Sequence, residues 1–114
     1  SLIHPGSSAT LPLMRGSCPT HLVLCHRAGM ETLPRVSWVK VPHLMTFARL
    51  YEDLGSACGT FPWPKVVGIA LNTSHLSGDE AGAAVEATHR ETGLPVCDPV
   101  RQGAEALLEA VLED

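Results

Sequence analysis

One apolar run in this chain ends in a polar corner and is followed, after a helical stretch, by a second short apolar run. The first run and its corner read KVVGIALNTS over residues 65–74, and the second reads LPVCDPVR over residues 94–101. A strand, a helix and a second strand in this order are typical of a parallel βαβ unit. Ligands of parallel sheets bind at the carboxyl ends of the strands, so we expect Asn72 and Asp98 at a binding site.

The composition predicts one globular unit over residues 1–114, because the chain is 45% hydrophobic and only 18% charged. A formal net charge of -4 and eight scattered Lys and Arg residues argue against nucleic acid as a partner. No apolar run reaches the roughly 18 residues of a membrane helix, and residues 1–6 lack the order of a signal peptide. We therefore expect a cytoplasmic location and no membrane partner. A small-molecule substrate and a homo-oligomer are expected as well.

The periodicity of the first half predicts a helix, a strand and a second helix. The first helix covers residues 8–15 and is closed by Gly16. The strand covers residues 21–26 and is aliphatic enough to be buried on both faces. The second helix covers residues 42–54, with Pro42 in its first turn and Gly55 as its C-terminal cap.

In the second half of the chain, the sequence predicts a helix and the residues at which it begins and ends. Ser77 and Glu80 form a capping box, and Gly93 is expected just past the helix end at positive φ. The buried stripe of this helix is predicted at four positions, Ala81, Ala84, Val85 and Thr88. A final amphipathic helix follows the Asp98-Pro99 turn, with its apolar positions at Ala104, Leu107, Leu108, Val111 and Leu112.

These elements alternate as α-β-α-β-α-β-α and predict an α/β fold with a parallel sheet of three strands in an α/β/α three-layer arrangement. So thin a sheet indicates the C-terminal part of a larger domain, and Leu2-Ile3 is expected to end a strand whose beginning is absent. Residues 27–41 show no periodicity and are the candidate lid or partner contact.

The four cysteines show no C-x-x-C pair and are expected to be reduced. The spacing of two cysteines and two histidines resembles a metal-ligand cluster: Cys18, His21, Cys25 and His26. Alternation along a strand would send Cys25 and His26 to opposite faces, so no metal site is expected. Cys25 and Cys97 are interpreted as small buried hydrophobic residues, and Cys18 and Cys58 carry no further signal.

Four segments together resemble the C-terminal half of a P-loop family described as D-glutamate N-acetyltransferase-like, long catalogued as a domain of unknown function. They are residues 1–6 (SLIHPG), 22–29 (LVLCHRAG), 67–74 (VGIALNTS) and 93–101 (GLPVCDPVR). The resemblance spans nearly the whole chain. It implies the C-terminal portion of a P-loop NTPase-like domain, whose G-x-x-x-x-G-K-[ST] phosphate-binding loop is not in this sequence.

The resemblance also implies a reaction, the transfer of an acetyl group from acetyl-coenzyme A to the amino group of D-glutamate. The cofactor implied is acetyl-coenzyme A or an adenine nucleotide, the latter with Mg²⁺ in the full-length protein. The alternative is a nucleotide-binding or regulatory P-loop-like module without catalysis of its own.

Acylation of an amine needs a base, and histidine is the natural one. His4 lies in a Pro-Gly turn after the presumed first strand, and His26 closes the strand that follows, so both are candidate catalytic residues. The alternative makes His4 a solvated turn residue and His26 a hydrogen-bonded strand end.

Four residues at the strand ends are candidates for cofactor binding: Asn72, Thr73, Asp98 and Arg101. An Asn at the place of Asn72 contacts adenine in the P-loop synthetases that the family resembles. The alternative is that Asn72, Thr73 and Ser74 hydrogen-bond within their own turn. Asp98 and Arg101 could pair, cap the last helix or hold a ligand phosphate or carboxylate, with capping expected of Asp98.

Overall fold

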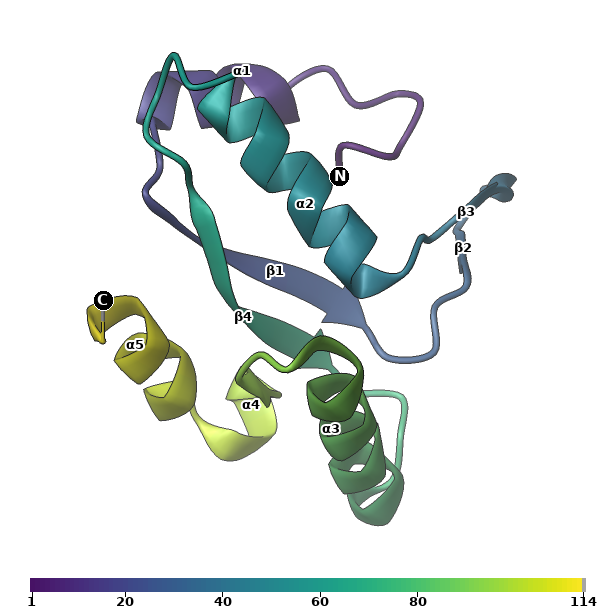
Figure 1. The fold of residues 1–114 in the computed structure, drawn as a ribbon. Coiled ribbons are helices and arrows are strands. Elements are labelled where there is room, and N and C mark those ends of the chain that lie inside the picture. The colour runs from purple at the N-terminus through teal and green to yellow at the C-terminus, as the bar shows by residue number, and fades with distance from the viewer. Residues whose placement is uncertain (114) are drawn as a thin grey trace. The chain divides into compact units, whose positions relative to one another are not determined.

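The computed structural model describes residues 1–113 and divides into two compact units, each described separately below. The first unit combines Ser1–His21 with Met30–Lys65, and the second combines Leu22–Gly29 with the chain from Val66 onward. Figure 1 follows these segments from purple at the N-terminus to yellow near the C-terminus. The prediction of one domain over residues 1–114 stays a prediction.

Two helices form the core of the first unit, α1 (Thr10–Ser17) and α2 (Leu44–Ser56), and they pack against each other. Met14 of α1 and Phe47 of α2 are buried, and the Phe47 ring lies 5.4 Å from that of Tyr51. Residues 1–6 form turns, so the prediction that Leu2-Ile3 ends a strand is wrong. The Leu2 N–H donates instead to the Tyr51 hydroxyl at 3.2 Å, which ties this end of the chain to α2.

The ends of α1 and α2 differ from the sequence prediction. Gly16 lies inside α1, whose cap is Cys18 at φ 47°. Helix α2 begins after His43 and ends at Ser56, with Ala57 as its C-terminal cap. Gly55 is therefore no cap. A Cβ built on it would lie 2.5 Å from Cγ of Pro64, so the close approach of that proline accounts for the glycine.

An antiparallel hairpin occupies the segment predicted to be irregular. Its strands are β2 (Thr32–Leu33) and β3 (Val36–Lys40), joined by a turn of Pro34 and Arg35. Arg35 has φ 65°, and proline followed by a residue at positive φ is typical of a type II turn, which normally uses glycine there. The sequence gives no sign of this turn, because Arg35 stands where a glycine is usually found.

The second unit contains a three-stranded sheet in the order β1 (His21–Arg27), β4 (Lys65–Asn72) and β5 (Val96–Cys97). Strands β4 and β5 are parallel, with Ile69 opposite Val96. Strands β1 and β4 also run in the same direction. The Lys65 N–H at the start of β4 donates to the carbonyl of Thr20 just before β1, and the Ala28 N–H just after β1 donates to the carbonyl of Asn72 at the end of β4. The parallel α/β class is therefore confirmed.

Burial differs sharply between these strands. Val66 and Val67 point to opposite faces of β4 and both are buried, as the middle strand of a parallel sheet requires. Strand β1 lies at the edge of the order, and Cys25 on it is exposed. The predictions that β1 is buried on both faces and that Cys25 is a buried hydrophobe are wrong, because an edge strand lacks the second neighbour.

Three helices complete the second unit: α3 (Gly78–Thr92), α4 (Pro99–Gln102) and α5 (Glu105–Leu112), labelled in Figure 1. Helices α3 and α5 both contact β5. The sequence predicts one final helix, but the structure divides it at Gly103 into α4 and α5. Within α5, Leu107 is buried, whereas Leu108 and Leu112 are exposed. Along the predicted stripe of α3, Ala81 is buried and the other members are half-buried. No helix described over residues 1–113 is long and apolar enough to cross a membrane.

Both ends of α3 match the sequence prediction. The Glu80 N–H donates to the Ser77 hydroxyl at 3.2 Å, and the Ser77 N–H donates to the Glu80 carboxylate at 3.1 Å, which completes the capping box. Gly93 caps the other end at φ 70°.

Replacing Gly93 with Val should therefore lower the free energy of unfolding by about 1–2 kcal/mol, the cost of a left-handed conformation for a residue with a Cβ. Urea denaturation of the intact protein measures it. Gly93→Asn is the control, because Asn tolerates this conformation better and should lose less. An unchanged midpoint for the Val variant would show that the helix end is wrongly placed.

Candidate functional site

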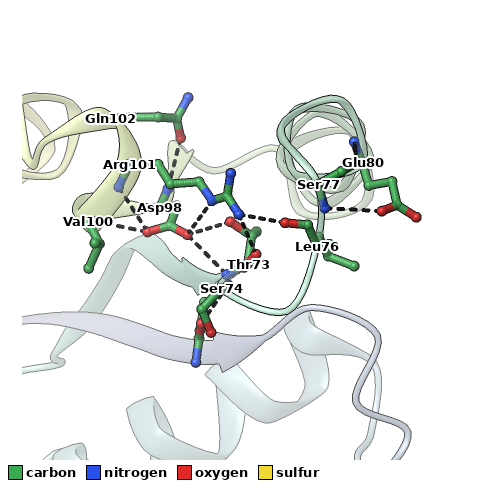
Figure 2. Close-up of polar contacts among 10 residues, drawn as sticks. Thr73, Ser74, Leu76, Ser77, Glu80, Asp98, Val100, Arg101 and Gln102 are labelled. Carbon is green, nitrogen blue, oxygen red and sulfur yellow. Dashed lines mark hydrogen bonds and ion pairs between the residues drawn. The ribbon is translucent and has the colours of Figure 1, made fainter.

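A buried polar contact joins the ends of β4 and β5. Thr73 follows β4 and is 0% exposed, and Asp98 follows β5 and is 4% exposed. The Thr73 N–H donates to Oδ2 of Asp98 at 3.0 Å, and the Thr73 hydroxyl donates to the same oxygen (Figure 2). These bonds join the two strand ends inside the protein, and the expectation of a binding site at Asn72 and Asp98 stays a prediction.

The second carboxylate oxygen of Asp98 caps α4. Its Oδ1 accepts the N–H groups of Val100 at 3.0 Å and Arg101 at 3.3 Å. The Asp98 N–H in turn donates to Oε1 of Gln102 at 2.8 Å. Pro99 suits the first helical position because its missing N–H needs no partner there. Capping, the role expected first for Asp98, is confirmed.

These contacts fix the charge of Asp98. The Thr73 hydroxyl, followed by backbone N–H groups, lowers the pKa of this carboxyl below its ordinary value, although burial acts in the opposite direction. A carboxylate that accepts several hydrogen bonds stays ionised even where it is buried. Both oxygens of Asp98 are thus occupied by donors of the protein itself.

Arg101 ties the corner after β4 to α4. One guanidinium nitrogen, Nη2, donates to the carbonyls of Thr73 at 3.2 Å and Leu76 at 2.6 Å, as Figure 2 shows. Its Nε lies 3.9 Å from Oδ2 of Asp98, so the two residues also form an ion pair. A planar guanidinium can bond several acceptors at once, and here it clamps both ends of the corner formed by residues 73–76.

Asn72 forms the turn that was weighed as the alternative to ligand binding. Its side-chain Oδ1 accepts the N–H of Ser74 at 3.0 Å, and its carbonyl accepts the N–H of Ala28 at 3.0 Å. Both Asn72 and Ser74 are exposed at the carboxyl end of the strand. The polar side chains of Asn72 and Ser74 are therefore exposed to solvent on a backbone that hydrogen bonds hold in place.

His75 belongs to this corner, and sequence reasoning missed it. Its Nε2 lies 2.8 Å from the carbonyl oxygen of Ala28, in the turn that follows β1. The residue is exposed. The available signal was its position directly after the Asn-Thr-Ser corner, at the carboxyl end of a buried parallel strand.

His26 is half-buried near the end of β1. Burial lowers the pKa of this imidazole from its ordinary value, and the carboxylate of Glu91 acts in the opposite direction. With an ordinary value near 6.5, a lowered pKa leaves His26 neutral at pH 7. A neutral imidazole has a lone pair and can accept a proton.

His4 lies in the first unit, apart in the chain from the residues just described. It is exposed in a turn, and its Nδ1 accepts the Gly6 N–H at 2.9 Å. In a neutral ring with Nδ1 engaged in this way, the hydrogen is on Nε2. His4 can therefore offer a donor, whereas action as a base would cost it the bond to Gly6.

The cysteines differ in exposure. Cys18, Cys25 and Cys58 are exposed free thiols, and Cys97 is buried. Burial raises the pKa of the Cys97 thiol, and two neighbouring carboxylates add to the rise, so it is no nucleophile near pH 7. Among residues 1–113, no three His, Cys, Asp or Glu side chains are grouped so that they could hold a metal ion.

Comparison with known proteins gives the family. Residues 1–108 match the model of a domain of unknown function, DUF1611_C, described as a P-loop domain. A protein named D-glutamate N-acetyltransferase from Tritonibacter scottomollicae is 35% identical over 97% of this chain and 33% of its own length. One of the same name from a Pseudoalteromonas species is 31% identical over 95% of this chain and 32% of its own.

A solved structure agrees with this assignment. The crystal structure of a DUF1611 family protein from Anabaena variabilis is 53% identical, with a TM-score of 0.98, over 100% of this chain and 33% of that one. This chain thus spans about a third of the length of the relatives that it matches. The chain belongs to the DUF1611 family, and residues 1–108 match the C-terminal part of its P-loop domain.

Proposed function

We propose that this chain takes part in the transfer of an acetyl group from acetyl-coenzyme A to the amino group of D-glutamate. The observation that carries the proposal is the shared name of the two curated relatives, both D-glutamate N-acetyltransferase, which match nearly the whole chain. The parallel sheet adds a suitable place for the reaction, because ligands of such sheets bind at the carboxyl ends of the strands.

Amine acylation needs a base that takes a proton from the attacking nitrogen. The neutral His26 suits that role better than His4, whose Nδ1 already accepts the Gly6 N–H.

The cofactor is proposed to lie on the corner after β4. An exposed amide such as that of Asn72 offers a donor and an acceptor side by side, which fits the edge of an adenine. Thr73, Asp98 and Arg101 support that corner from below, since their described contacts are with one another and with backbone groups. Asp98 does not fit a Mg²⁺ ligand, because both of its oxygens already accept protein donors.

The test is product formation by the intact protein. Incubation with acetyl-coenzyme A and D-glutamate should release free coenzyme A thiol and yield N-acetyl-D-glutamate, measured by a thiol reagent and by chiral chromatography with mass detection. L-Glutamate and D-aspartate are the comparison substrates. Absence of N-acetyl-D-glutamate would refute the reaction.

The second candidate function is a nucleotide-binding or regulatory module without catalysis, which the P-loop description of the family favours. It predicts calorimetric binding of ATP with Mg²⁺ by the intact protein and no acetyl transfer. Binding of acetyl-coenzyme A together with product formation would exclude this alternative as the main activity.

Replacing Asn72 with Asp separates the cofactor role from the turn. The Asp side chain can still accept the Ser74 N–H, but it has no amide donor for an adenine. We expect the KM for acetyl-coenzyme A to rise about tenfold, the value of one lost hydrogen bond, with kcat nearly unchanged. Ser74→Ala is the control, because it keeps the backbone N–H in the turn. A wild-type KM in Asn72→Asp would limit Asn72 to shaping the turn.

A further inference from the structure

We infer that His75 is a further catalytic residue of this site, which takes a proton from the amino group of the substrate at its Nδ1. The inference rests on the proposed acetyl transfer and adds to it a residue that neither the sequence motifs nor the relatives assign.

The contact with Ala28 determines where the ring hydrogen lies. A carbonyl oxygen can only accept, so the Nε2 of His75, 2.8 Å away, must donate and therefore carries the hydrogen. In the neutral ring, Nδ1 then holds the lone pair. The imidazolium also carries a hydrogen on Nε2, so Nδ1 can gain and lose a proton while the bond to Ala28 persists.

The corner that carries His75 is fixed on several sides. Arg101 bonds the carbonyls of Thr73 and Leu76, which flank it (Figure 2). Thr73 is anchored to Asp98, and the Asn72 side chain holds the N–H of Ser74. A proton acceptor works best when its support holds it near the productive geometry, and this corner has that support without using the Nδ1 of His75.

Charged groups from two helices face this corner. The carboxylate of Glu80 in α3 interacts with His75, and bonds to the backbone N–H and hydroxyl of Ser77 lower the pKa of that carboxyl, so it is ionised at neutral pH. It attracts the imidazolium that forms when Nδ1 takes a proton. Arg101 of α4 acts in the opposite direction, but its charge is partly offset by its ion pair with Asp98.

The protons of the reaction can be followed one by one. The substrate amine arrives as an ammonium group, and Nδ1 of His75 takes one of its protons. The freed lone pair forms a bond to the thioester carbon, and the C–S bond breaks with its electron pair on sulfur. The nitrogen's second proton passes to that sulfur, which leaves as the thiol. His75, being exposed, returns the first proton to water.

The test replaces His75 with Gln in the intact protein. The Gln amide can still donate to the Ala28 carbonyl, but it cannot exchange a proton. We expect kcat/KM for D-glutamate at pH 7 to fall about 100-fold. The deficit should shrink as the pH is raised to about 10, because the free amine then forms in water without a base.

The control is His89→Gln. His89 is also exposed and bonds a backbone carbonyl, that of Leu94, through Nδ1 at 2.6 Å, but it lies at the other end of α3. It should keep wild-type kinetics. If the wild-type protein forms N-acetyl-D-glutamate and His75→Gln matches it, the inference is wrong. A loss that does not change with pH would reveal a structural role and also overturn it. Absence of product in the wild type would refute the proposed function itself.

Discussion

Replacing Asp98 with Asn is expected to lower the melting temperature of the intact protein by about 5–10 °C. The carboxylate accepts from the N–H and hydroxyl of Thr73 on one oxygen and from two backbone N–H groups of α4 on the other. Asn offers one oxygen in place of two, and its NH₂ group would face donors. A buried N–H or O–H donor without an acceptor lowers the stability of the folded state, because its desolvation free energy is no longer offset by a hydrogen bond. Thermal unfolding followed by circular dichroism measures the change.

The matched control is Asp79→Asn, which removes the same charge from an exposed residue in the first turn of α3. It should shift the melting temperature by no more than about 2 °C. Equal effects of the two substitutions would show that Asp98 acts only through its charge.

The stabilisation by Asp98 should depend on pH in a defined direction. Its pKa is lowered in the folded protein, so the stabilisation is fully present above the ordinary value near 4 and is lost as the pH falls through the folded value. The difference in melting temperature between wild type and Asp98→Asn should be constant from about pH 5 to 8 and should close below about pH 4. A difference that persists unchanged at low pH would contradict the pKa shift.

Replacing His26 with Gln is expected to lower kcat for acetyl transfer by about 100-fold or more and to leave the KM for acetyl-coenzyme A nearly unchanged. The reason is that burial keeps this imidazole neutral at pH 7, where it can accept a proton that Gln cannot. Steady-state kinetics with D-glutamate measure both constants.

Cys25→Ser is the control for that substitution, because Cys25 precedes His26 on β1 and is exposed. It should retain wild-type kcat. A His26→Gln enzyme with unaltered kcat would remove His26 from the proposed mechanism and leave the base to another residue.

The elements that sequence reasoning placed well are those whose ends are determined locally. The α3 helix is defined by a capping box at Ser77 and a left-handed Gly93, and both signals lie within a few residues of the ends that they mark. The buried strand β4 was equally clear, because consecutive apolar residues on both faces occur mainly in the interior of parallel sheets.

The elements that were misplaced depend on contacts distant in sequence. Gly55 is typical of a cap in the sequence, but it lies inside α2 against Pro64, and the cap is Ala57, two residues later. Cys25 looks buried until β1 is placed at an edge of the sheet. The hairpin of β2 and β3 lacked a glycine at its corner, since Arg35 takes the positive φ.

The candidate site shows the same division. Capping by Asp98 follows from its place before Pro99 and was expected from the sequence. The bond from Arg101 to the carbonyl of Leu76 spans 25 residues and has no local signal. The contact between His75 and Ala28 spans 47 residues, so no spacing rule could have found it.

The different roles of buried and exposed residues in the corner after β4 have a consequence for engineering of this surface. Thr73 and Asp98 are buried, and with Arg101 they bond the backbone beneath the corner, whereas Asn72, Ser74 and His75 carry the exposed side chains. A library that varies Ser74 while Asn72, His75 and the three supporting residues are retained can change the exposed surface of the corner on an unchanged backbone. Exposure alone therefore does not mark the positions of this corner that are open to substitution.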